Sequence, residues 1–229
     1  MTKVPEGRYH GGKEKGSGSM TKRQEQAQAS RRKIFETAKG LIGEKGYQNV
    51  TISQIVQACG MSVGNFYHYF SSKDEVILYV ERSLYDQLDQ CLDAMEERPL
   101  EEKLRYYFRE WAKLMVEDYG PNFNRQWIAY HAMDSASTKK AGEKNKIDES
   151  AATIQKFLET AIEKGELCPA TPTEELARLM VFAEFGALLY FCMTDGKFDL
   201  LQWAVDYSGT MKDTLLAPYW KGSESPPAP

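Results

Sequence analysis

Polar-tipped aromatic side chains and small residues lie together in one short stretch, MSVGNFYHYF at positions 61–70. The hydroxyl and imidazole groups of Tyr67, His68 and Tyr69 suit hydrogen bonds to phosphate oxygens, as backbone amides do. Small residues such as Gly64 at a helix N-terminus let that helix sink into a DNA major groove, where side chains reach base edges. These residue types therefore predict a DNA contact surface.

Two short helices must position this stretch, because helix-end signals lie close together around it. Thr51-Ile-Ser-Gln54 has the pattern of a capping box, Gly60 can end that helix, and Ser62 can cap another. On the second helix Phe66 and Phe70 lie four residues apart, so both point inward. Their expected partners are Ile34, Leu41, Ile52, Ile55 and Val56. The pair has helix-turn-helix spacing.

The cations of the chain are concentrated in the same region. Residues 20–75 carry eight Lys or Arg against five Asp or Glu, whereas residues 76–229 carry seventeen against twenty-six. A second capping pattern, Ser72-Lys-Asp-Glu75, is expected to open a long helix to about Glu97, with the Lys73 cation at an anion-favouring N-terminus. A net positive charge in residues 20–75 is typical of a region that binds a polyanion, although an ordinary solvated surface can carry the same excess of positive charge. The cations expected near phosphates are Lys22, Arg23, Arg31, Arg32 and Lys33.

No stretch alternates as a strand does, so we expect an all-α chain of about nine helices. The first of the later helices is expected to run from Pro99 to Gly120-Pro121, and a second lies around Trp127. A third is expected over residues 146–164, a fourth from a third capping box at 171–174 to near Gly196, and a fifth over residues 199–216. The segment between the helix around Trp127 and residue 146 is expected to be a mobile loop or a frayed helix end.

From Arg31 to about Val80 the chain resembles the DNA-binding domain of the TetR (tetracycline repressor) family of transcriptional regulators, and the matching string, from Thr51 to Glu75, is TISQIVQACGMSVGNFYHYFSSKDE. It departs from the family pattern at Cys59, Met61 and Asp74, where alanine, valine and glutamate are usual. The resemblance covers about a quarter of the chain. It implies phosphate contacts from Thr51, Ser62, Tyr67, His68, Tyr69 and Lys73, and base contacts from Val63, Gly64 and Asn65.

The resemblance divides the chain into four segments. Residues 1–19 are expected to be a disordered leader or tag with a linker, or else a natural disordered arm, and residues 222–229 a disordered tail. Residues 20–72 would form the helix-turn-helix DNA-binding domain. Residues 73–221 would form a larger helical domain that dimerises and encloses a small molecule, as in the family.

Aromatic, methionine and small residues in the later helices are candidates for both tasks, although core packing is the alternative for each. The ligand-binding candidates are Tyr107, Trp111, Met115, Phe123, Trp127, Tyr130, His131, Phe182, Phe185 and Leu189. The dimer-interface candidates are Ala183, Gly186, Ala187, Tyr190, Trp203, Tyr207 and Met211.

Glu184 stands out within the apolar run LMVFAEFGALLYF. It could counter a cationic ligand, pair across the dimer or reach solvent, and we favour the last. His131 is expected to be a structural hydrogen-bonding residue. We expect no metal or cofactor and no enzyme activity, because the chain has no H-E-x-x-H, G-x-S-x-G, P-loop or G-x-G-x-x-G motif. Four dispersed cysteines and no signal peptide favour a reduced, cytoplasmic protein, and the apolar run fits a buried helix better than a membrane span.

The sequence therefore predicts a homodimeric repressor that binds a roughly palindromic double-stranded operator and leaves it when a small apolar or aromatic effector binds. Effector binding would swing the helix that starts at Lys73 and change the separation of the two recognition helices. The alternatives are a ligand-independent or activating regulator and, in a different class, a helical ligand-binding or interaction module that does not read DNA.

Overall fold

The computed structural model describes residues 21–77, 79, 95, 97–133 and 146–221, and within these ranges the chain is helical with connecting turns and no strand. An isolated antiparallel bridge joins Leu167 to Trp220. The all-α prediction is confirmed. The predicted leader, the segment at 134–145, the tail and most of the long helix expected after Ser72 lie outside the described residues.

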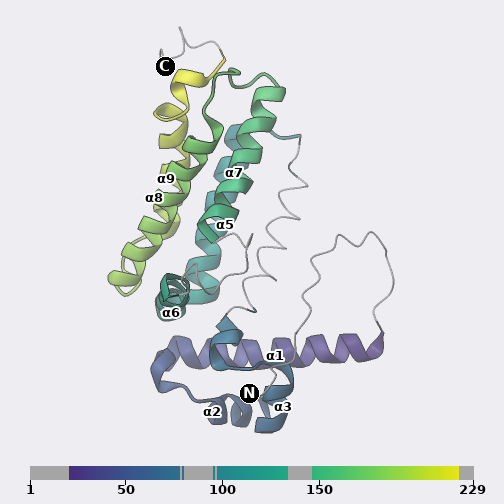
Figure 1. The fold of residues 1–229 in the computed structure, drawn as a ribbon. Helices are drawn as coiled ribbons and strands as arrows, with labels where there is room; N and C mark the ends of the chain where they lie inside the picture. The colour runs from purple at the N-terminus through teal and green to yellow at the C-terminus, as the bar shows by residue number, and fades with distance from the viewer. Residues whose placement is uncertain (1–20, 78, 80–94, 96, 134–145, 222–229) are drawn as a thin grey trace, which may run out of the picture.

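The N-terminal helices form a small unit with its own core. Helix α1 (Lys22–Lys45) lies crosswise, and η1 (Tyr47–Asn49), α2 (Ile52–Cys59) and α3 (Val63–Tyr69) pack on one side of it (Figure 1). The side chains buried here are Ile34, Ala38, Ile42, Ile55, Val56, Phe66 and Phe70. The inward orientation of the two phenylalanines is therefore confirmed, and they stabilise a helix too short to be stable alone.

Four long helices form the C-terminal bundle. Helices α5 (Leu100–Lys113), α7 (Lys146–Glu163), α8 (Thr173–Met193) and α9 (Leu200–Asp213) run side by side, and η3 (Ala217–Tyr219) follows (Figure 1). Helix α7 packs along α8, and α5 packs along α9. Helix α8 is long and apolar enough to cross a membrane by length and composition, but half of its apolar window is buried inside the protein, as in the core helix of a soluble fold.

Helix α6 (Gly120–Met133) connects the two units. It follows a π-helical turn, η2 (Leu114–Tyr119), and Gly120 takes the positive φ of 65° that separates them. Helix α6 lies between the bundle and α1 (Figure 1), and it contacts both α1 and α8. The Nδ2 of Asn122 donates to the Gly43 carbonyl of α1 at 2.9 Å. The predicted break at Gly120 is confirmed, but the α-helix before it ends earlier, at Lys113.

Two of the predicted helix starts are wrong in detail. Pro99 is the residue before the first turn of α5 and not its first helical residue. The expected capping box at Thr171 is absent, because the Thr171 hydroxyl donates to the Cys168 carbonyl at 2.6 Å. That bond closes the turn before α8, which begins at Thr173 without a side-chain cap.

Candidate functional site

The turn between α2 and α3 is built from three local signals. The Thr51 hydroxyl accepts from the Gln54 amide at 3.2 Å, and the Gln54 side chain accepts from the Thr51 amide at 2.8 Å, which completes the predicted capping box. Gly60 has a left-handed backbone, with φ of 67°. The Ser62 hydroxyl then accepts from the Asn65 amide at 3.1 Å and starts α3.

The outer face of α3 is open to solvent. Val63 is 43% exposed and Tyr67 is 55% exposed, while Gly64, Asn65 and His68 are also exposed. A Cβ added to Gly64 would meet only the Ser62 hydroxyl, at 3.9 Å. The start of α3 therefore offers small side chains and one amide, and polar-tipped rings follow.

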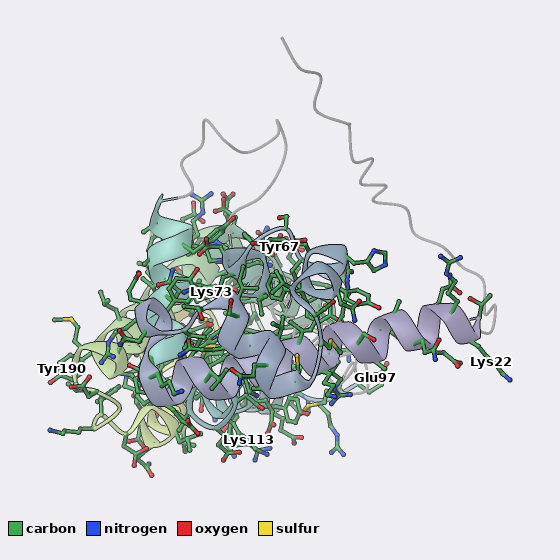
Figure 2. The ribbon with its side chains drawn as sticks, turned by 90° about the horizontal axis from the view of Figure 1, so that it is seen from below. Lys22, Tyr67, Lys73, Glu97, Lys113 and Tyr190 are labelled. Carbon is green, nitrogen blue, oxygen red and sulfur yellow. The ribbon has the colours of Figure 1, made fainter. Side chains whose placement is uncertain are left out.

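Tyr69 and Arg31 fix the end of α3 against α1. Tyr69 is half-buried, and its carbonyl accepts from Nη2 of Arg31 at 3.2 Å. The Arg31 guanidinium lies 5.9 Å from the centre of the Phe70 ring and 5.8 Å from that of Tyr79. Arg31 thus has a structural contact in addition to its charge. Lys22, Arg23, Arg32 and Lys33 are exposed along α1, and Lys22 lies at its far end (Figure 2).

Lys73 is an internal tether as well as a cation at a helix start. Its Nζ donates to the carbonyls of Tyr47 at 2.7 Å and Val50 at 2.6 Å, and it lies 3.8 Å from the centre of the Tyr47 ring. Burial lowers the pKa of the Lys73 ammonium, and the charge of Asp74 opposes this. One of the three ammonium protons remains for a phosphate oxygen.

Tyr47 and Asp74 complete this cluster. The Tyr47 hydroxyl donates to the Asp74 carboxylate, and burial, this hydrogen bond and the Asp74 charge all raise the pKa of Tyr47. Sequence reasoning identified Lys73 but not these two partners. A separation of 26 residues leaves no periodic signal, so the cluster could only be found in three dimensions.

The ligand-binding candidates divide into two groups. Tyr107, Trp111, Met115 and Phe123 are buried in the core, and Trp127, Tyr130, His131 and Phe185 are half-buried. The structure brings Trp127 to 4.6 Å from His131 and 5.7 Å from Phe185, measured between ring centres. Phe182 and Leu189 lie apart from these rings, because they are 55% and 47% exposed on the surface of α8.

The dimer-interface candidates divide in the same way. Gly186 and Tyr190 are exposed and Ala183 is half-buried, whereas Ala187, Tyr207 and Met211 are buried within one protomer. Trp203 is half-buried and stacks on Tyr207, with the ring centres 4.5 Å apart. Tyr190 lies at the edge of the molecule opposite Lys22 (Figure 2).

A polar network on α6 connects the end of α8 to α1. Arg125 donates to the Cys192 carbonyl through Nε at 3.1 Å and Nη2 at 2.7 Å, and it forms an ion pair with Asp195. Its Nη1 donates to Oδ1 of Asn122 at 2.7 Å, and Asn122 in turn binds Gly43. Sequence reasoning missed this network. The described residues include no group of three side chains arranged to hold a metal ion.

Comparison with known proteins gives a family match at the α1–α3 unit. The model described as "Bacterial regulatory proteins, tetR family" matches residues 34–80. The HTH-type transcriptional regulator UidR of Escherichia coli is 27% identical over 171 residues, which are 74% of this chain and 85% of UidR. The regulator BetI of Brucella anthropi is 29% identical over 112 residues, 48% of this chain and 58% of BetI.

The fold of most of the chain resembles that of a known regulator. FadR of Thermus thermophilus, described as a TetR-family transcriptional repressor in complex with lauroyl-CoA, superposes with a TM-score of 0.60 and 21% identity. The match covers 79% of this chain and 92% of FadR. At this identity the likeness shows the fold. The family match confirms the resemblance to TetR regulators that the sequence predicts.

Proposed function

We propose that the chain is a homodimeric repressor of the TetR type that leaves its operator when a small effector binds, because residues 34–80 match the tetR family model and the fold resembles that of a TetR-family repressor. The observation that best supports DNA reading is the outer face of α3, where Val63, Gly64 and Asn65 are exposed at the start of the helix. Tyr67 and His68 are exposed further along. Because no acidic side chain lies within α3, this face presents no charge that would repel a phosphate.

The two ends of α3 have different roles in the proposal. Small residues admit the helix to the major groove, and the Asn65 amide can pair with an adenine edge in the bidentate manner typical of asparagine. Residues around the groove hold the sugar-phosphate backbone and fix the register. We assign base contacts to Val63, Gly64 and Asn65, and phosphate contacts to Thr51, Ser62, Tyr67, His68, Tyr69 and Lys73.

An exposed apolar face on α8 supports the homodimer. Five large apolar side chains of α8 are exposed, and so is one on α9; they are Leu179, Phe182, Leu189, Tyr190 and Met193 on α8 and Val205 on α9. Apolar patches of this kind mark interfaces. A Cβ at Gly186 would meet nothing within 4 Å, so a partner helix can approach closely there. We therefore assign Phe182 and Leu189 to the dimer face with Ala183, Gly186 and Tyr190, and Ala187, Tyr207 and Met211 to the protomer core.

The remaining ligand candidates support an effector site inside the bundle. Rings from four helices form two pairs there: Tyr107 of α5 lies 6.2 Å from Phe157 of α7, and Trp127 of α6 lies 5.7 Å from Phe185 of α8, measured between ring centres. Buried rings with a few polar groups are typical of small-molecule sites. Thermus thermophilus FadR holds lauroyl-CoA on the same fold, which supports regulation by a small molecule here.

The contacts of α6 suggest how the two sites are coupled. A shift at the end of α8 would move Arg125 through its bonds to the Cys192 carbonyl, and Asn122 would carry the shift to Gly43 of α1. The Lys73 tether would then pass it to the loop that precedes α2. Such discrete contacts let effector binding alter the spacing of two recognition helices. We place the protein in the cytoplasm, where the DNA is.

Selection from a random duplex library tests the proposed function. The full-length chain should enrich a nearly palindromic sequence, because a two-fold dimer reads two equivalent half-sites. Asn65→Ala should change the preferred bases within each half-site and keep the palindrome. Failure to enrich any sequence would contradict DNA reading and favour a helical ligand-binding module. Genes next to the selected site would then be assayed to separate repression from activation.

A further inference from the structure

The carboxyl group of Glu184 is buried in the bundle without a partner. The side chain is 0% exposed, and neither of its oxygens has a hydrogen-bond partner. It lies on the buried stripe of α8 that includes Met180, Val181 and Leu188. Our preference for a solvent-reaching Glu184 is therefore wrong, because the helix turns this residue towards the core.

The aromatic side chain of Tyr207 lies near Glu184. The Tyr207 hydroxyl on α9 donates at 3.0 Å to the carbonyl of Met180, one helical turn before Glu184. Burial and, second, the charge of Glu184 raise the pKa of Tyr207, which places the two groups within electrostatic reach of each other. The Tyr207 ring also stacks on Trp203 and meets the edge of Phe108, with ring centres 5.1 Å apart.

Nothing in the described bundle neutralises this carboxylate. The buried ammonium of Lys103 lies over the Phe157 ring, 6.0 Å from its centre, and forms no ion pair with Glu184. Burial raises the pKa of Glu184 well above its ordinary value, because a low-dielectric surrounding disfavours the charged carboxylate. A buried polar group without a hydrogen bond destabilises the fold unless a ligand pairs with it.

We propose that Glu184 is the counter-ion for an organic monocation, an ammonium or amidinium with apolar substituents, which is the effector of this regulator. The carboxylate supplies the opposite charge, and the faces of neighbouring rings such as Tyr207 attract a cation further. An apolar effector without polar groups would leave the carboxyl unpaired, and an anion would oppose its ionisation. The inference rests on the proposed effector-controlled function and names the chemical class of the effector.

A thermal-shift screen of the full-length dimer tests the class of the effector. The probes are quaternary ammonium and amidinium ions, each beside an uncharged isostere; benzyltrimethylammonium and 2,2-dimethylpropylbenzene form the first pair. At least one cation should raise the melting temperature by several degrees at saturation, and its isostere should raise it much less. Equal shifts from cation and isostere across the whole panel, or no shift from any cation, would overturn the proposal.

Variants of Glu184 test the residue. Glu184→Gln should keep the helical circular dichroism of the parent and bind the selected cation at least about tenfold more weakly. Glu175→Gln, on the exposed side of the same helix, is the matched control and should bind like the parent. Glu184→Leu provides a second variant if the glutamine protein does not fold. Parental affinity in a folded Glu184 variant would contradict the assignment.

Release of a labelled operator separates this inference from the proposed function. The cation should displace the operator from the parent and from Glu175→Gln, and should fail to displace it from Glu184→Gln. Release of the parent by uncharged ligands alone would overturn the cation proposal and leave the regulator intact. A parent that binds no DNA at all would instead refute the proposed function.

Discussion

The α1–α3 unit and the C-terminal bundle differ in where each leaves chemical groups without partners. In α2 and α3 the buried side chains are apolar, and side-chain hydrogen bonds cap the start of each helix. The polar side chains that remain available to a partner, such as Asn65 and Tyr67, are therefore exposed on the outer surface. In the bundle the carboxyl of Glu184 is buried without a hydrogen-bond partner, and large apolar side chains such as Phe182 are exposed on the surface.

This difference shows what kind of partner each region suits. Exposed polar groups on a short, rigid helix suit a wet, charged partner such as DNA. A buried acid suits a small ligand that enters the protein, and an exposed apolar face suits another protein surface. On the proposed function, the two units of the chain would therefore bind three different partners, and α6 with its Arg125 network contacts both units.

The largest expected effect comes from the apolar face of the bundle. Phe182→Asp with Leu189→Asp should weaken the dimer about 100-fold or more, because two charges would be buried without partners in the interface. Sedimentation velocity would show monomers at micromolar concentration, and operator binding would fall with dimerisation. The matched control is Glu175→Asp on the same helix. A stable double-aspartate dimer would show that this face is not the interface.

The next effect tests whether the α1–α3 unit depends on a buried tether. Lys73→Met removes two charged hydrogen bonds to the Tyr47 and Val50 carbonyls and should lower the free energy of unfolding by about 2–3 kcal/mol. Urea unfolding followed by circular dichroism measures this change. Lys113→Met, at an exposed position on α5, is the control and should change it little. Equal stability of the two variants would mean that Lys73 acts only as a phosphate contact.

A smaller effect, on the pH dependence of stability, tests the buried carboxyl of Glu184 in the bundle. Burial raises the pKa of Glu184 in the folded protein well above its ordinary value of 4.5. The neutral side chain therefore contributes fully to the stability of the fold below pH 4.5, and this contribution is lost as the pH rises through the folded-state pKa. Glu184→Gln removes this loss. The variant should be more stable than the parent by about 1 kcal/mol or more at pH 8, and the difference should shrink towards pH 4. Parallel stability curves across this range would show that Glu184 does not titrate as proposed.

The smallest effect concerns the exposed cations of α1. Lys22→Ala should lower the slope of log affinity for the operator against log salt by about one, with a few-fold loss of affinity at moderate salt. Lys113→Ala, which removes a cation from the bundle, should leave the slope unchanged. Fluorescence anisotropy over a range of potassium chloride concentrations measures both. Identical slopes for the two variants would place Lys22 outside the DNA contact.

The α1–α3 unit could be predicted closely because its signals are local. A capping box spans four residues, and Gly60 and Ser62 are adjacent to the helices that they end and begin. Phe66 and Phe70 point inward by spacing alone. What could not be predicted is the Tyr47–Asp74–Lys73 cluster, because its members come together only when the chain folds back across 26 residues.

The bundle was harder to predict because α8 is apolar on nearly all sides. Periodicity could not separate a face that meets the protomer core from a face that meets a partner, so Phe182 was grouped with the ligand site and Ala187 with the interface. Phe182 is exposed and Ala187 is buried, so we propose the interface for Phe182 and the protomer core for Ala187. Glu184 was recognised as unusual, but its direction depends on how α8 rotates against α7 and α9, which the sequence alone does not determine.

Hydroxyl-radical footprinting on the selected duplex tests the central claim most directly. A dimer that places one α3 in each of two major grooves should protect two segments related by two-fold symmetry, with centres about 10 base pairs apart or a multiple of that spacing. Tyr67→Ala should weaken both protections equally, because both copies hold phosphates through this residue. A single protected segment, or a footprint that Tyr67→Ala leaves unchanged, would contradict the account.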